Sequence, residues 1–248
     1  MNQIICGDAL EVLKTMQDET VDLVVTSPPY NFDMGYDNHN DNTDTTRYMT
    51  FLMKILNECI RVTKKGGRII INIQPNYKQH FPTHHAITTE LIKRGLLWRG
   101  EVVWQKNNLK KLTAWGSWMS PSCPYLSYPF EFIEVFSKGT LKHTGEKKNI
   151  DITKEEFVTY VNGMWSMAPE KRMKQFNHPA MYPEELVYRC LKLFSYKGDL
   201  ILDPFNGAGT TTYVAHMLER NYIGIDISPA YCEVAKNRIA SHNKLPLE

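Results

Sequence analysis

The sequence predicts an α/β fold, in which a mostly parallel sheet of seven strands carries helices on both faces. Seven short runs are rich in β-branched residues and apolar along their length, which is typical of strands buried on both faces. Helical apolar patterns lie between several of these runs, and such alternation favours a parallel sheet. The chain has 248 residues, 42% of them hydrophobic and 23% charged. This is enough for one domain with its own core, spanning residues 1–248.

The strands are expected where apolar runs meet turn residues. The first run precedes Gly7, the second stops at Pro28, the third follows the glycine turn at 66–67, and the fourth follows Gly100. The fifth ends before Gly139, the sixth follows the lysine-glycine pair at 197–198, and the last has an aspartate as its next-to-last residue. In order, the predicted strands are 2–6, 21–26, 68–73, 101–105, 130–137, 199–202 and 222–227.

The helices are expected where apolar residues recur every three or four positions. Leu10, Leu13 and Met16 share one face of the first. Pro183 followed by two acids is a good helix start. In order, the predicted helices are 9–16, 48–62, 86–93, 183–194, 211–219 and 230–241.

Two segments do not fit the alternation. Residues 31–46 hold four Asp and four Asn, without Lys or Arg, and are expected to form a polar loop. Residues 107–177 are expected to contain an inserted target-recognition segment, although its second half also fits a plain surface excursion. The basic stretch 93–111 has six Lys or Arg against one acid, with Trp98 and Trp104 interleaved. Such a stretch can follow a phosphate backbone or simply be a solvated surface.

Composition excludes several classes of protein. The net charge is +2, which neither requires nor excludes a nucleic-acid partner. No window approaches a membrane span and the first residues do not resemble a signal peptide, so we expect a cytoplasmic protein without membrane contact. The five cysteines are scattered, and the histidines at 80, 84 and 85 lack partner ligands at a recognisable spacing. Neither disulfides nor a metal site is therefore expected.

The most informative stretch is DLILDPFNGAGTTT at 199–212. A strand runs into a turn in which Gly207 and Gly209 let the backbone approach a ligand, and a helix N-terminus follows. A second strand, YIGIDI, ends in Asp226, and an acid at that place commonly binds ribose hydroxyls. The pair predicts a ligand with a ribose, whereas the missing third glycine disfavours a nicotinamide-dependent dehydrogenase.

A second motif, VVTSPPYN at 24–31, ends a strand in a stiff turn. Its two prolines fix φ and remove two N–H donors, so the turn is rich in acceptors. The Ser27 hydroxyl and the carbonyls of Ser27 and Pro28 could accept hydrogen bonds, and Tyr30 offers a flat face for stacking. A rigid surface turn with an exposed tyrosine is the alternative.

Together these motifs resemble the S-adenosylmethionine-dependent DNA methyltransferases that modify amino groups. That family has a D-P-F-x-G-x-G-T cofactor motif, here at 203–210, and an S/D/N-P-P-Y/F/W catalytic motif, here at 27–30. Because the catalytic motif comes first, the chain resembles the circularly permuted β group. The resemblance implies a Rossmann-like sheet in permuted order. Its N-terminal strand would lie beside the catalytic strand, and the last two strands would carry the cofactor.

The resemblance also implies roles for single residues. Ser27, Pro28, Pro29 and Tyr30 would hold the target base. Asp226 would hold the ribose and Asp8 the adenine edge of S-adenosylmethionine. The remaining cofactor-binding positions would shape the methionine and sulfonium pocket or bind the carboxylate: Asp203, Pro204, Phe205, Gly207, Gly209, Thr210 and Thr211.

The implied reaction is methylation of an exocyclic amine on a base flipped out of double-stranded DNA. In the resembled family, serine at the first catalytic position favours cytosine N4, with adenine N6 as the alternative. Methylation of RNA, and a DNA-binding relic without activity, are weaker alternatives. A homodimer and a restriction endonuclease partner fit the family, but no residue in the sequence specifies them.

Overall fold

The computed structural model describes residues 2–31, 43–107, 116–173, 175–176 and 178–242. These residues form one open sheet of eight strands in the order β1-β8-β7-β2-β3-β5-β4-β6. All neighbouring pairs are parallel except β3·β5 and β5·β4, so β5 alone runs against the others. The prediction of a mostly parallel α/β sheet is therefore confirmed.

Seven strands occur where the sequence predicted them, with ends that differ by up to five residues. The eighth, β6, was not predicted. The strands are β1 Asn2–Cys6, β2 Val21–Thr26, β3 Thr63–Ile73, β4 Leu96–Lys106, β5 Phe130–Lys138, β6 Met164–Met167, β7 Leu200–Asp203 and β8 Asn221–Asp226.

The six predicted helices are all present, and a short helix α4 is added. They are α1 Ala9–Thr15, α2 Thr45–Val62, α3 Thr83–Lys93, α4 Lys154–Tyr160, α5 Glu184–Phe194, α6 Thr210–Met217 and α7 Pro229–His242, with a 3₁₀ turn at Lys147–Asn149. Helix α2 begins earlier than predicted because the Asp44 carboxylate accepts hydrogen bonds from the backbone N–H groups of Thr46 and Arg47. Most of the predicted polar loop, residues 32–42, lies outside the described residues.

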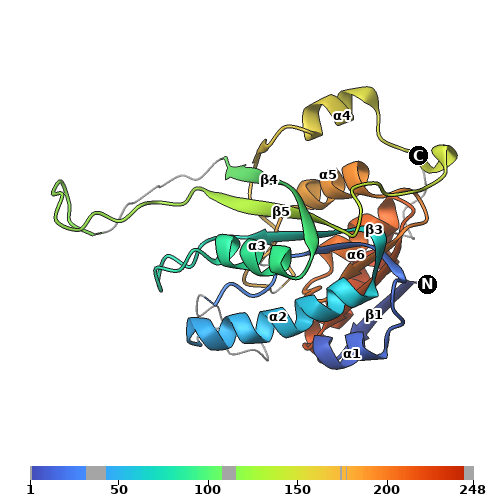
Figure 1. Cartoon of the computed structure of the whole chain (residues 1–248), viewed down its shortest axis with the longest axis horizontal. Helices are drawn as coiled ribbons and strands as arrows, with labels where there is room; N and C mark the ends of the chain where they lie inside the picture. Colours follow the sequence, from blue (N-terminus) through green and yellow to red (C-terminus); the bar gives the residue numbers. More distant parts are fainter. Residues whose placement is uncertain (1, 32–42, 108–115, 174, 177, 243–248) are drawn as a thin grey trace.

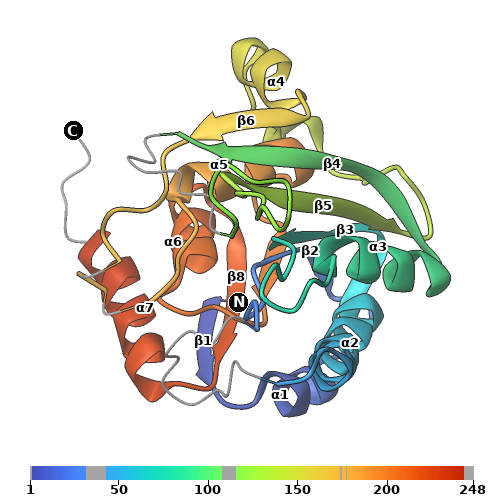
Figure 2. The same ribbon diagram turned by 90° about the vertical axis from the view of Figure 1, so that its left-hand side faces the viewer.

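The helices cover the two faces of the sheet as separate layers (Figures 1 and 2). One core cluster joins α1, α2 and α3 to one face, and its fully buried members include Leu52, Leu56 and Ile71. The other cluster joins α5, α6 and α7 to the opposite face around Val187, Leu191 and Ile201. The central strands are buried on both sides, which explains their continuous apolar runs.

The position of β1 corrects one expectation. The N-terminal strand does not lie beside the catalytic strand β2, because β7 and β8 lie between them. The burial of the strands gives the reason. β7 and β8 are almost entirely buried and need neighbours on both sides, whereas β1 has only exposed and partly buried residues and suits the sheet edge.

The segment 107–177 does not stand apart from the sheet. It contains β5 and β6, and β6 pairs with β4 at the edge. Its described parts outside the sheet are a long arm at 116–129, which projects from the body between β4 and β5, and residues 139–163 with α4 (Figure 1). No helix within the described residues is both long and apolar enough to cross a membrane.

Candidate active site

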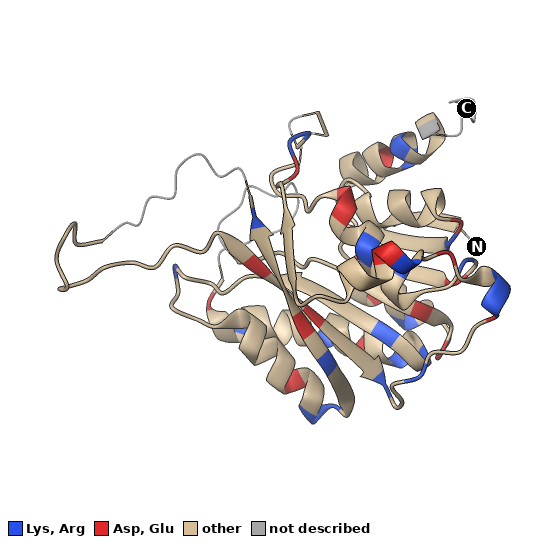
Figure 3. Ribbon diagram, turned by 90° about the horizontal axis from the view of Figure 1, so that it is seen from above, with Lys and Arg blue, Asp and Glu red and all other residues tan. Residues whose placement is uncertain are grey.

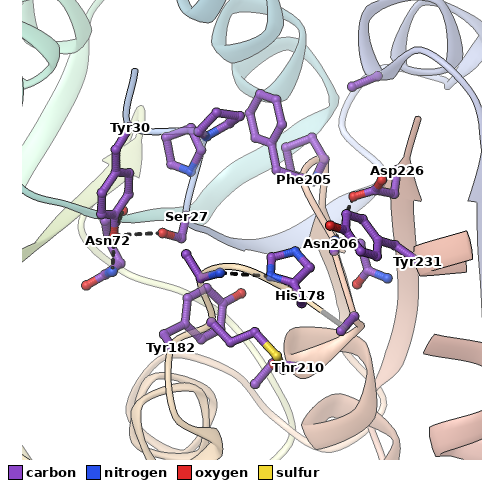
Figure 4. Close-up of a pocket in the computed structure, with 18 of the residues that line it drawn as sticks. Ser27, Tyr30, Asn72, His178, Tyr182, Phe205, Asn206, Thr210, Asp226 and Tyr231 are labelled. Carbon is purple, nitrogen blue, oxygen red and sulfur yellow. Dashed lines mark hydrogen bonds between the residues drawn. The ribbon is translucent and has the colours of Figure 1, made fainter. Parts of the chain in front are cut away.

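A pocket of the described structure lies where neighbouring parallel strands end. Ser27 follows β2, Phe205 follows β7, Asp226 ends β8 and Asn72 lies near the end of β3. Because these strands are adjacent and parallel, their carboxyl ends meet at one edge of the sheet, where α/β proteins bind ligands. All four residues line one cavity of about 210 Å³ (Figure 4).

The catalytic turn and the glycine loop occupy opposite sides of this pocket. Figure 4 places Ser27 and Tyr30 on one side and Asn206 and Asp226 on the other, with His178 between them. Ten of the thirteen residues predicted for the site line the cavity: Asp8, Ser27, Pro28, Pro29, Tyr30, Pro204, Phe205, Gly207, Thr210 and Asp226. The other three, Asp203, Gly209 and Thr211, lie outside its lining.

Asp203 is completely buried and binds the two halves of the site together. Its carboxylate accepts hydrogen bonds from Thr26 Oγ1 at 2.7 Å, Thr211 Oγ1 at 2.7 Å and Tyr182 Oη at 3.0 Å. It also accepts the backbone N–H of Phe205 at 3.0 Å. Burial raises the pKa of Asp203, and these four hydrogen bonds act in the opposite direction. Because Thr26 directly precedes Ser27, the catalytic turn and the cofactor motif share one anchor.

The glycine loop owes its shape to the absence of side chains. Gly207 has φ +49°, and a Cβ there would lie 2.6 Å from His178 Nε2. Its N–H donates to Asp226 Oδ2 at 2.7 Å, which joins the loop to the end of β8. Gly209 has φ +80° and begins α6, and a Cβ there would lie 2.6 Å from Ala235 Cβ of α7. Gly209 therefore permits helix packing behind the pocket.

Asp226 keeps acceptor capacity toward the pocket. Each of its oxygens accepts one backbone N–H, from Gly207 and from Ser228 at 2.9 Å, so further lone pairs remain. Burial raises the pKa of Asp226, while these two bonds lower it. Nearby, the Asn206 side-chain amide nitrogen is buried without a hydrogen-bond partner among the described residues. A ligand with both hydroxyl donors and acceptors would satisfy this end of the pocket.

The catalytic turn is held from outside. Tyr48 of α2 donates its hydroxyl proton to the Pro29 carbonyl at 2.8 Å. Within the described chain no donor reaches the Pro28 carbonyl, so it remains available as an acceptor. The Tyr30 hydroxyl bonds to Ser27 Oγ at 2.9 Å and to Glu131 Oε2 at 2.7 Å.

Other predicted residues have local partners. The Asp8 side chain caps α1 by accepting the N–H of Glu11 at 3.1 Å, and it lies exposed at the rim of the pocket. The Phe205 ring lies 6.2 Å from the ring of Phe51 on α2. Thr210 opens α6 and reaches the pocket, whereas Thr211 is engaged with Asp203.

Several residues that line the pocket were not predicted from the sequence. Asn72 and Glu131 are almost fully buried on β3 and β5. The signal that could have identified both is a polar residue within an otherwise apolar strand. His178 stands between the two halves of the site, its Nδ1 accepts the N–H of Ala180 at 3.3 Å, and burial lowers its pKa to about 4. Tyr182 and Tyr231 had no signal in the sequence.

The basic stretch 93–111 is largely engaged with the protein itself. Lys93 and Arg94 pair with Glu90, and Lys106 pairs with Glu131. Arg99 donates to the Leu141 carbonyl at 2.8 Å. The lysines at 110 and 111 lie outside the described residues. The described arm 116–129 contains no charged residue, as Figure 3 shows, but exposes Trp118, Met119 and Leu126.

Asp22, His143 and Asp199 lie at the opposite ends of the strands. Their ligand atoms are within 4.8 Å of one another, a spacing that could hold a metal ion. However, Asp22 already accepts Lys64 Nζ at 2.6 Å and the N–H of Leu200 at 2.9 Å. The Lys64 ammonium supplies the positive charge at this cluster, so the cluster stabilises contacts within the protein.

Comparison with known proteins defines the class. The model of the DNA methylase family N6_N4_Mtase matches residues 21–237, and the chain belongs to this family. The type II methyltransferase M.MjaVI of Methanocaldococcus jannaschii is 34% identical over 63% of this chain and 81% of its own length. The DNA adenine methyltransferase YhdJ of Escherichia coli is 29% identical over 96% of this chain and 83% of its own length.

Solved structures share the whole fold. The Thermus thermophilus protein TTHA0409, in complex with S-adenosyl-L-methionine, aligns with a TM-score of 0.76 at 26% identity over 98% of this chain and 97% of that one. The cytosine-N4-specific PvuII DNA methyltransferase aligns with a TM-score of 0.71 at 18% identity over 96% of this chain and 86% of that one. The chain is therefore a DNA amino-methyltransferase of the N4-cytosine or N6-adenine type.

Proposed function

We propose that this chain transfers a methyl group from S-adenosylmethionine to N4 of a cytosine flipped out of double-stranded DNA. The observation that carries the proposal is a single cavity lined by the Ser27–Tyr30 turn on one side and by Gly207 and Asp226 on the other. A methyl donor bound at the loop and an amine held at the turn would meet in that cavity. Such positioning supplies much of the rate of a group transfer.

The pocket fits S-adenosylmethionine. When bound, this cofactor supplies a methyl group activated by a sulfonium. The free acceptor positions of Asp226 suit ribose hydroxyls, and the unpartnered Asn206 amide nitrogen suits an acceptor on the ligand. The first turn of α6, which begins at Thr210, offers N–H groups to a carboxylate. Asp8 at the rim is assigned to the adenine edge by the resemblance alone.

The catalytic turn acts on the target amine. The lone pair of an exocyclic amine is delocalised into its ring, which makes the amine a poor nucleophile. Acceptors on its two N–H groups draw the nitrogen toward a tetrahedral geometry with an available lone pair. Ser27, Pro28 and Tyr30 line the cavity. In this proposal the Ser27 hydroxyl and the Pro28 carbonyl would accept these bonds, and the Tyr30 ring would stack on the base.

The choice of base rests on Ser27, since serine at this position is typical of cytosine N4 enzymes in the resembled family. Adenine N6 is the second candidate, and the observation that favours it is the 29% identity to an adenine methyltransferase over 96% of the chain. The same acceptors would serve either amine.

We assign DNA contact to the arm at 116–129, which projects beyond the body of the protein (Figure 1) and exposes Trp118, Met119 and Leu126. A second copy of the chain would add contacts that one arm cannot supply. A restriction endonuclease as cellular partner fits the type II methyltransferases among the relatives.

Nucleoside mass spectrometry of mixed-sequence DNA incubated with the protein and S-adenosylmethionine tests the proposal. A rise in N4-methylcytosine supports it. A rise in N6-methyladenine keeps the enzyme class and overturns the base. If a preparation with an intact active site binds the cofactor but yields no methylated nucleoside, the proposed reaction on DNA is overturned.

Tyr30→Ala tests the role of the catalytic turn. We expect methyl transfer to fall by at least about 100-fold, because base stacking and the anchored turn are lost, while the cofactor Kd from calorimetry stays within about twofold. Loss of cofactor binding in the same variant would mean that Tyr30 supports the pocket as a whole.

A further inference from the structure

A buried hydrogen-bond network connects the catalytic turn to β3, β4 and β5. Tyr30 Oη lies 2.7 Å from Glu131 Oε2, 2.7 Å from Asn72 Nδ2 and 2.9 Å from Ser27 Oγ. Asn72 Nδ2 also donates to Glu131 Oε2 at 2.5 Å. The other oxygen of Glu131 lies 2.5 Å from Lys106 Nζ. Asn72 and Glu131 are 2% and 6% exposed, so bulk water does not compete with these bonds.

Counting protons fixes the direction of each bond. An ionised glutamate only accepts hydrogen bonds, so the single hydroxyl proton of Tyr30 points to Glu131. The carbonyl of Asn72, at 3.5 Å from Tyr30 Oη, is a much weaker competitor. The amide of Asn72 donates to Tyr30 Oη. The remaining bond, between Ser27 and Tyr30, therefore has Ser27 as the donor.

This direction matters for the amine. With its proton directed to Tyr30, the Ser27 hydroxyl presents only lone pairs to the pocket. A hydroxyl free to rotate could instead turn its proton toward the target nitrogen and oppose the reaction. The Lys106 ammonium, 2.5 Å from Glu131 Oε1, can only donate, so Glu131 is the acceptor in that pair as well.

We infer that Glu131 is a positioning residue that, through Tyr30, holds the Ser27 hydroxyl oxygen as an acceptor for the target amine. The inference rests on the proposed function, because it assigns a direction to a hydrogen bond that methyl transfer would use. Glu131 touches neither the methyl group nor the amine in this scheme. Its effect passes entirely through the Tyr30 hydroxyl.

Glu131→Gln is the decisive change, because it keeps the size of the side chain and alters its hydrogen bonding. The glutamine amide can donate to Tyr30 Oη, which releases the tyrosine proton toward Ser27 and the serine proton toward the pocket. We expect kcat to fall about 10- to 100-fold, the loss expected for one misdirected hydrogen bond. The KM for DNA and the cofactor Kd should stay within about twofold.

The cycle with Tyr30→Phe separates positioning from packing. Phenylalanine keeps the stacking ring but removes the hydroxyl, so Glu131→Gln should change kcat less than about twofold in that background. Glu134→Gln is the matched control. Glu134 is also buried on β5, but it faces Trp98, and its replacement should leave kcat unchanged.

The outcomes are distinct. An active wild type with a large effect of Glu131→Gln that vanishes in the Tyr30→Phe background supports the inference. An equal loss in both backgrounds, or a loss of cofactor binding in Glu131→Gln, overturns it and leaves the proposed function standing. A wild type that binds the cofactor but methylates no DNA overturns the proposed function, and the inference with it.

Discussion

Replacing Gly209 by alanine tests how closely the cofactor loop packs on the last helix. Gly209 has φ +80°, and its added Cβ would lie 2.6 Å from Ala235 Cβ and 3.0 Å from Ala235 Cα. Gly198 has nearly the same φ, +86°, but nothing lies within 4 Å of an added Cβ. The two glycines therefore differ in packing and not in backbone conformation.

The backbone cost and the packing cost of Gly209→Ala can be separated. Alanine in the left-handed region costs roughly 1–2 kcal/mol, and this applies to both variants. Alanine also restricts the unfolded chain more than glycine does. This effect on stability is the same in both variants, so it cancels in the comparison. Overpacking against Ala235 adds roughly 1–3 kcal/mol for Gly209→Ala alone. We expect a loss of about 1–2 kcal/mol for Gly198→Ala and about 2–5 kcal/mol for Gly209→Ala.

Urea unfolding of the two variants measures these free energies directly, with unchanged m-values as the check on two-state behaviour. Cofactor affinity from calorimetry is the second readout, and only Gly209→Ala should weaken it, because Gly209 is the N-cap of α6. Equal losses of stability in both variants would refute the reasoning, since they would mean that α7 can move aside at no cost.

Three further changes test other parts of the structure. Because burial raises the pKa of Asp226, S-adenosylmethionine affinity should fall as the pH is lowered through that raised value, and Asp226→Asn should bind weakly at every pH; a flat wild-type profile from calorimetry would contradict the ribose assignment. Burial also raises the pKa of Glu134 to about 7, with Glu101 acting in the same direction. The contribution of Glu134 to stability is therefore fully present below its unfolded pKa of about 4.5 and lost as the pH rises through 7. Glu134→Gln should accordingly stabilise the fold by about 1–3 kcal/mol at pH 8 and very little near pH 4.5, as measured by urea unfolding at both pH values. Trp118→Ala on the uncharged arm should weaken DNA binding about 10-fold or more without changing the salt dependence or the melting temperature; a reduced salt slope would point to lost phosphate contacts instead.

The sheet could be predicted because its strands are buried on both faces and leave continuous apolar runs in the sequence. β6 was not predicted because it has only four residues, MWSM, and none of them is β-branched. The position of β1 was also missed, since strand order depends on which strands need two neighbours. That requirement became visible only with the burial of β7 and β8.

The candidate site was predictable where chemistry and backbone shape are local. Motifs such as the glycine loop and the two prolines have fixed spacings, so their residues could be named in advance. The partners of Tyr30 could not, because Asn72 and Glu131 lie 42 and 101 residues further along the chain. A buried polar residue in an apolar strand signals that a partner exists but does not identify it. The shared anchor at Asp203 was hidden for the same reason.

The edge strand β1 has a consequence for how the protein forms during synthesis. Its only strand partner in the described sheet is β8, and Asn2 pairs with Tyr222. At roughly 5–20 residues per second, a ribosome needs roughly 10–40 s to reach β8 after making β1. Throughout that time β1 lacks its partner, and β7 is also still missing from its place beside β2. Contacts between residues far apart in the sequence slow folding, because the entropy of closing a long loop is lost before the contact can stabilise the fold. The methyl-transfer pocket, which needs β2, β7 and β8 together, can therefore form only after β8 has been made.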